Sequence, residues 1–168
     1  KLDPETIRSA EFSAQQYLGL NLWGSARLYY NRIDDLIALL TDPADGLLVF
    51  QNTKGADQKG VELEFEGRWQ NGVRSRLSYA LQQTKGLDTH KILLNSPTHL
   101  VKFNGVAPLW SDKLYLGLEE QFTSSRKTIL GNPARSYFIT NVTLFSEKIV
   151  NGLEASASIY NVFNKKYS

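Results

Sequence analysis

The two histidines, His90 and His99, are the first candidates for metal or acid–base chemistry in this sequence. They lie nine positions apart, and the chain has no cysteine that could complete a metal site. Ser96 and His99 could suggest a serine–histidine hydrolase pair, but Pro97 lies between them and the spacing matches no known nucleophile signature. We therefore predict no catalytic residue, no metal site, no cofactor and no enzymatic activity.

A second group of candidates consists of carboxylates and guanidinium groups that alternate with apolar residues. Side chains two positions apart in an extended strand lie on one face, about 7 Å from each other, so a catalytic carboxylate pair is conceivable. Cross-strand ion pairs along a wet interior are the interpretation we favour. The six residues concerned are Glu62, Glu64, Glu66, Arg68, Arg74 and Arg76.

Basic residues also gather between positions 124 and 135. Arg126, Lys127 and Arg135 lie in this segment, which we predict to be an outer loop. Guanidinium groups bind carboxylates through paired hydrogen bonds, so these residues are our candidates for an anionic ligand such as an iron chelate. A solvated loop without a ligand is the alternative.

Composition narrows the class of protein. Hydrophobic residues make up 42% of the chain and charged residues 21%, which is typical of a folded protein. The formal net charge is only +2, so we expect no nucleic-acid partner. No apolar run approaches the roughly 20 residues of a membrane helix. The N-terminus shows no secretory signal, so we expect either that one was removed or that the chain begins within a longer protein.

Strict alternation of apolar and polar residues is the strongest pattern, and it predicts β-strands with two different faces. The Asn71-Gly72 pair predicts a tight hairpin turn. A short β extension is expected near 47–50. The eight strands that we predict are 6–18, 20–33, 59–69, 72–83, 98–108, 113–124, 136–146 and 152–163.

The predicted connections alternate between short turns and long loops, and the strands are about twice as long as the 5 to 6 residues usual in soluble proteins. Both features predict an all-β, antiparallel, up-and-down transmembrane β-barrel segment. Glu120 is an exception, because it falls on the lipid-facing register, unless it lies beyond the apolar band or a bulge shifts the strand. Aromatic residues near predicted strand ends are candidates for the membrane interface: Trp69, Tyr79, Trp110 and Phe122.

Several segments resemble the C-terminal barrel of TonB-dependent receptors, over essentially the whole chain. Their order along the chain is more specific than any one of them. They are 2–5 (LDPE) with 9–11 (SAE), 28–37 (LYYNRIDDLI), Asn52 with 59–64 (KGVELE), 96–100 (SPTHL), 152–154 (GLE) and 159–167 (IYNVFNKKY).

The resemblance implies that residues 1–168 form about eight strands of a larger barrel of about 22 strands in the bacterial outer membrane. It implies that the N-terminal plug and the final strand are absent from this chain, and that the six charged residues at 62–76 face the lumen or the plug. The expected function is active import of a siderophore–metal complex, a corrinoid or a similar large nutrient. The expected partners are outer-membrane lipid, the imported ligand and, through the missing plug, a TonB-type energy-coupling protein.

Two alternatives remain open at the level of sequence. A passive outer-membrane porin or adhesin would share the strand pattern, and a soluble all-β binding module would accept charges on its solvent face. A plug domain upstream would exclude the first, and strands of five or six residues in a soluble monomer would support the second. We also expect the isolated fragment to associate through its open strand edges and exposed apolar face.

Overall fold

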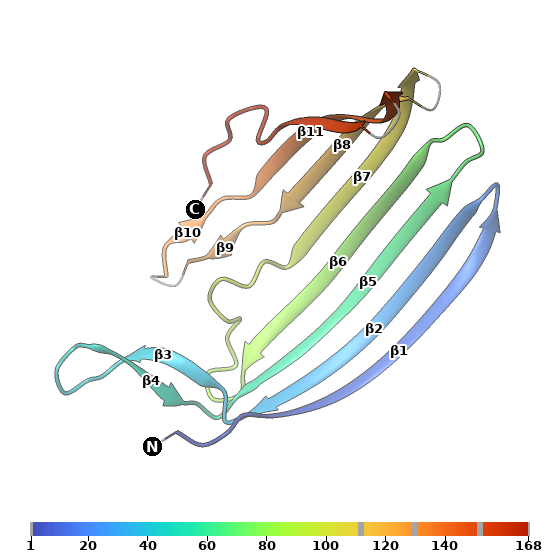
Figure 1. Cartoon of the computed structure of the whole chain (residues 1–168). Coiled ribbons are helices and arrows are strands. Elements are labelled where there is room, and N and C mark those ends of the chain that lie inside the picture. Colours follow the sequence, from blue (N-terminus) through green and yellow to red (C-terminus); the bar gives the residue numbers. More distant parts are fainter. Residues whose placement is uncertain (1, 111–112, 129–130, 151–152, 168) are drawn as a thin grey trace.

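The chain forms one large antiparallel sheet, as its alternating apolar and polar residues predict (Figure 1). The structure is a computed structural model, and it describes residues 2–110, 113–128, 131–150 and 153–167. Eight strands lie in the sheet in chain order, so the topology is up-and-down, as predicted. Among the described residues, no helix is both long and apolar enough to cross a membrane. The strands are β1 (Thr6–Gly19), β2 (Leu22–Asp34), β5 (Ala56–Arg68), β6 (Arg74–Gly86), β7 (His99–Trp110), β8 (Leu114–Thr123), β11 (Tyr137–Val150) and β12 (Leu153–Ile159).

The short hairpins follow from residues that accept positive φ. Leu20 and Asn21 form a two-residue turn with φ of 53° and 60°, the arrangement that suits the twist of a hairpin. The prediction that a strand begins at Leu20 was therefore wrong, because the turn occupies that position. At the next short turn Gly72 has φ of 83°, and the Trp69 amide donates to the Val73 carbonyl at 2.9 Å, which confirms the predicted hairpin.

Strand boundaries otherwise differ from the predicted ones by a few residues, most of all at the end of the chain. The last strand was predicted to reach 163 but β12 ends at Ile159. Asn161 has φ of 49°, and its side-chain Oδ1 accepts a hydrogen bond from the Lys165 amide at 2.8 Å, so the chain turns there instead. The predicted short turns near 108–112 and 147–151, and the predicted strand start at 152, include positions outside the described residues.

The long connections all lie at the end of the sheet opposite the short turns (Figure 1). The first contains a small hairpin of β3 (Ile37–Thr41) and β4 (Leu48–Asn52), which confirms the predicted β extension. The third contains β9 (Arg126–Lys127) paired with β10 (Pro133–Ala134). Loop length therefore distinguishes the two ends of the sheet.

The sheet has almost no core of its own. Among the described residues, the buried apolar side chains are only Ala56, Tyr115 and Ala134. One face instead exposes large apolar groups, such as Phe12 at 67% and Leu28 at 50% exposure. Burying such a face is the dominant favourable term in folding, so this sheet requires an apolar environment that the chain does not supply.

Glu120 lies on this apolar face. The pairing of β8 with β11 runs unbroken past it, and the irregularity between β7 and β8 lies at Pro108 and Trp110, so no bulge shifts its register. The Thr140 hydroxyl on the adjacent strand donates to the Glu120 carboxyl at 2.8 Å. This hydrogen bond gives one partner to a carboxyl that would otherwise face apolar neighbours.

Gly55 lies where the first long loop joins β5, in a backbone conformation that a substitution can test. Its φ is 110°, and a Cβ added there would overlap the carbonyl oxygen of Ile33. We expect Gly55→Ala to destabilise the full-length protein by about 2 kcal/mol or more, because L-residues are strained at this φ and the clash involves backbone. Gly117→Ala is the matched control, since its added Cβ meets the nearest atom, the Thr143 carbonyl oxygen, at an ordinary 3.5 Å.

The measurement is the temperature at which the folded, heat-modifiable gel band of the full-length protein disappears. Equal transition temperatures for the two variants would contradict this description of the loop.

Candidate functional site

The polar face of the sheet carries the charged side chains predicted to form cross-strand ion pairs. Glu62 on β5 lies directly opposite Arg27 on β2 in the strand register. The Arg27 guanidinium donates to the Glu62 carboxylate at 2.6 Å and lies 3.6 Å from that of Glu11 on β1. Three consecutive strands are thus joined by one guanidinium group. Arg27 and Glu11 had not been predicted as site residues, although their even spacing from other polar-face residues indicated the same face.

A second network lies nearer the short turns. The Glu66 carboxylate accepts hydrogen bonds from Arg76 at 3.0 Å and from Arg68 at 2.8 Å. Arg76 also lies 3.7 Å from the Glu64 carboxylate. Arg74 pairs with Arg68 in the register of β5 and β6, which places it on the same face. The six predicted residues therefore share one face of two adjacent strands.

Between these networks the polar face contains a depression of about 620 Å³. Small hydroxyl side chains form much of its floor, with charged groups around them. No three His, Cys, Asp or Glu residues gather into a metal-binding set in the part of the chain that the structure describes. The arrangement suits a polar surface that exchanges hydrogen bonds with a ligand or another domain. Its polar lining includes Ser13, Gln15, Ser25, Arg27, Glu62, Glu64, Ser78 and Lys102.

The basic residues of the third long loop have different environments. The Arg126 Nε donates to Asn95 Oδ1 at 2.7 Å, and its guanidinium lies 5.6 Å from the centre of the Tyr137 ring. Arg126 therefore helps to hold two loops together. Lys127 and Arg135 are exposed. The contact with Asn95 was not predicted, because residues 31 positions apart meet only through the tertiary fold.

The four aromatic residues predicted for the membrane interface lie on or beside the apolar face. Trp69 covers Gly67, Trp110 pairs with Leu114, and Phe122 pairs with Val101 and Phe138. Tyr79 lies in the middle of β6, because that strand continues to Gly86, and its hydroxyl is 2.9 Å from His99 Nδ1. Their placement at headgroup depth stays a prediction.

Comparison with known proteins places this geometry in a family. The family model described as "TonB dependent receptor-like, beta-barrel" matches residues 1–162. The chain belongs to that family. Its members are proteins of the bacterial outer membrane, which gives the exposed apolar face its lipid environment and excludes the soluble alternative.

Individual relatives agree with this placement. The chain is 26% identical to the ferric-pyoverdine 358 receptor of Pseudomonas putida, an alignment that covers 99% of this chain and 22% of that protein. The copper transporter OprC superposes with a TM-score of 0.81 at 18% identity, over 100% of this chain and 27% of OprC. The siderophore receptor PirA of Acinetobacter baumannii gives a TM-score of 0.77 at 16% identity, over 98% of this chain and 28% of PirA. This TonB-dependent receptor barrel chain thus spans about a quarter of the length of its relatives.

The Arg27–Glu62 pair permits a direct test of the polar-face network. We expect Arg27→Gln and Glu62→Gln to show a coupling free energy of about 0.5 kcal/mol in a double-mutant cycle, a small value because both side chains are partly exposed to screening solvent. The measurement is urea unfolding of the full-length protein in lipid vesicles.

Arg27→Gln combined with Glu66→Gln is the matched cycle, because those two side chains belong to different networks. We expect that cycle to be additive. Equal coupling in the two cycles would show that the measured term is a general charge effect and not the contact.

Proposed function

We propose that the full receptor containing this chain imports a siderophore-bound metal, or a nutrient of similar size, across the outer membrane. The observation that supports this most directly is an amphipathic transmembrane sheet whose polar face carries fixed ionic networks around a depression of about 620 Å³. The relative from Pseudomonas putida is named a ferric-pyoverdine receptor, which favours an iron chelate as cargo.

In this proposal the chain supplies the C-terminal part of the barrel wall, and the plug and final strand belong to the rest of the receptor. The alignments cover only 22% to 28% of the relatives named above, as expected for one part of a larger barrel. The outer strands β1 and β12 each have one partner in this sheet. Their open edges would pair with the remaining strands, and in isolation they would promote association.

The polar face is assigned to the plug. Carboxylates and guanidinium groups at the lumen surface can hydrogen-bond a domain that must later move, since exposed pairs are individually weak and exchange readily with water. A TonB-type protein acting through the plug would provide the energy for that movement. No bond of the nutrient is changed, so the proposed process is transport and not catalysis.

The long-loop end is assigned to first contact with the ligand. Lys127 and Arg135 present exposed positive charge there, and Arg126 is held by Asn95 and Tyr137. Ferric siderophores carry anionic oxygen donors, which attract such side chains. Arg126 would then position the loop while its two exposed neighbours attract the ligand.

The test is binding of ferric pyoverdine to the full-length receptor, followed by uptake of radioactive iron in iron-starved cells. We expect Lys127→Glu combined with Arg135→Glu to weaken binding about five- to tenfold, because two attractive charges become repulsive. Lys113→Glu, compared with each of the single variants Lys127→Glu and Arg135→Glu, is the control, since it reverses one exposed positive charge in the short turn between β7 and β8.

Loss of uptake on deletion of the gene, with restoration by the wild-type copy, would support import. Iron uptake that is unchanged by deletion would contradict the proposed cargo. Binding that is equally weak in the control would contradict the assignment of the loop. A receptor that passes the nutrient without an energised inner membrane would favour the passive porin instead.

A further inference from the structure

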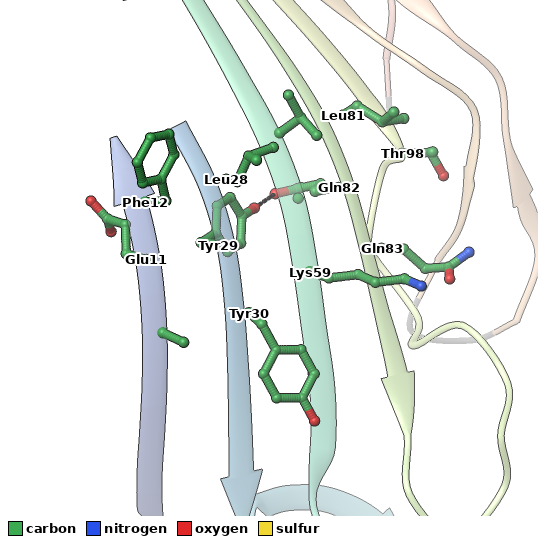
Figure 2. A pocket seen from close by; sticks show the side chains of 13 residues that line it. Glu11, Phe12, Leu28, Tyr29, Tyr30, Lys59, Leu81, Gln82, Gln83 and Thr98 are labelled. Carbon is green, nitrogen blue, oxygen red and sulfur yellow. Dashed lines mark hydrogen bonds between the residues drawn. The ribbon is translucent and has the colours of Figure 1, made fainter. Parts of the chain in front are cut away.

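The apolar face changes character near the long-loop end of β1, β2, β5 and β6. On the side nearer the short turns, this face carries a groove of about 680 Å³ whose apolar lining includes Phe12, Leu28, Val61 and Leu81. On the side nearer the long loops lies a second pocket of about 640 Å³, which is lined mainly by charged and polar residues. Tyr30, Lys59 and Gln83 line both, so the two hollows adjoin. Figure 2 shows the three apolar side chains Phe12, Leu28 and Leu81 on one side of Lys59 and Tyr30 on the other.

The strand register places the charged pocket on the lipid-facing side of the sheet. Tyr30 pairs with Lys59, and Lys59 pairs with Gln83, one two-residue step beyond the row Leu28–Val61–Leu81. Successive side chains alternate between faces, so both rows lie on the same face. Lys85 follows one step further along β6, opposite Asp57. This pocket is therefore separate from the polar depression assigned to the plug.

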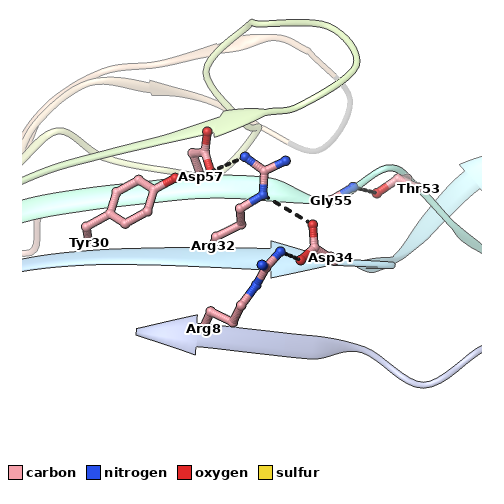
Figure 3. A network of polar contacts seen from close by, with 7 residues as sticks. All are labelled: Arg8, Tyr30, Arg32, Asp34, Thr53, Gly55 and Asp57. Atoms are coloured by element: carbon pink, nitrogen blue, oxygen red, sulfur yellow. Dashed lines mark hydrogen bonds and ion pairs between the residues drawn. The ribbon is translucent and has the colours of Figure 1, made fainter. Parts of the chain in front are cut away.

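The carboxylates near this pocket already have partners (Figure 3). Asp57 accepts a hydrogen bond from the Tyr30 hydroxyl at 2.7 Å and lies 3.7 Å from the Arg32 guanidinium. Asp34 lies 2.5 Å from Arg8 and 3.3 Å from Arg32. The two arginines and two aspartates thus neutralise one another and form a fixed edge on β1, β2 and β5.

The remaining cations are not neutralised in this way. Lys54, Lys59 and Lys85 line the same pocket and are exposed, and no ion pair of theirs is seen in the described part of the chain. His90 lines the pocket as well. Three lysines beside an ion-paired Arg32–Asp57 unit give the pocket a positive charge. It faces outward at the level where the apolar surface ends, which is where lipid headgroups lie.

We propose that this paired groove and pocket bind a phosphorylated lipid of the outer leaflet. The phosphate groups would lie among Lys54, Lys59 and Lys85, and an acyl chain would lie along Phe12, Leu28 and Leu81. Ammonium groups bind phosphate as point charges, and a continuous apolar groove below them fits a molecule with a charged head and a hydrocarbon chain. A soluble anion would use the pocket but would gain nothing from the groove. The inference rests on the orientation of the sheet in the membrane and not on the identity of the imported nutrient.

The experiment uses the full-length receptor in detergent, with bound lipid counted by native mass spectrometry. The titrants are a diphosphorylated, hexa-acylated lipid A, zwitterionic phosphatidylcholine and inorganic phosphate. We expect Lys59→Gln combined with Lys85→Gln to weaken lipid A binding about tenfold, because two headgroup charges are lost. Binding of phosphatidylcholine should not change. Lys113→Gln combined with Lys166→Gln removes the same charge outside the pocket and should bind lipid A like wild type.

A second pair of variants tests the groove. Phe12→Ala removes a ring that is 67% exposed in the groove, and it should weaken lipid A binding several-fold. Phe138→Ala is the control: it removes a ring that is 50% exposed on β11, outside the groove, and lipid A binding should not change. The heat-modifiable gel band verifies that each variant is folded.

Equal lipid retention by wild type and the Lys59/Lys85 variant would overturn the proposal, as would an equal loss in the Lys113/Lys166 control. Inorganic phosphate that binds as tightly as lipid A, with the same dependence on the lysines, would identify a free-anion site and overturn the lipid assignment. Ferric pyoverdine binding is measured on the same samples. A failed cargo assay with intact lipid selectivity would contradict the proposed import and leave the lipid site standing.

Discussion

The structure depends on satisfying every backbone hydrogen bond in a medium without water. In the hydrocarbon layer an unpaired amide or carbonyl costs several kcal/mol, so only a continuous ladder of strands can cross. The six inner strands of this sheet each pair on both sides, and the outer strands β1 and β12 pair on one. In the receptor that we propose, other strands would complete the ladder at these two edges. The scarcity of buried apolar side chains has the same origin, because lipid takes the place of a protein core.

The second organising feature is that each strand separates lipid from water: side chains at alternate positions face the lipid, and those between them face the polar side. Leu28 and Arg27 are adjacent in the chain, yet Leu28 lines the apolar groove and Arg27 is ion-paired with Glu62 on the other face. A register shift of one residue would exchange them and expose the ionic networks to lipid. The main contribution of cross-strand pairs such as Arg27–Glu62 is therefore to favour the correct strand register, since an exposed ion pair adds little to the free energy of folding. Glu120 departs from this separation, and its hydrogen bond with Thr140 is the compensation that the fold provides.

The long-loop end carries two groups of exposed positive charge. Lys127 and Arg135 are exposed in the third long loop, whereas Lys59 and Lys85 line the charged pocket beside the apolar groove. Proximity along the chain does not separate these roles. The strand register does so for Lys59 and Lys85, which share the face of Leu28, and the lipid site proposed above rests on that face.

The sequence by itself determined the strands, their two faces and the alternation of short and long connections, because a period of two and turn residues such as Asn71-Gly72 are local signals. It also placed the six charged residues from Glu62 to Arg76 on one face. Local signals did not locate the turn at Leu20-Asn21 or the end of the last strand, because Leu20 has no turn preference and Asn161 lies among apolar and aromatic residues that are typical of a strand. Only the tertiary structure decided which charges meet, because partners such as Arg27 and Glu62 are 35 positions apart and contact through strand register. It alone joined Arg126 to Asn95 and brought Lys59 and Lys85 to one pocket, since the fold brings together side chains that no spacing along the chain relates.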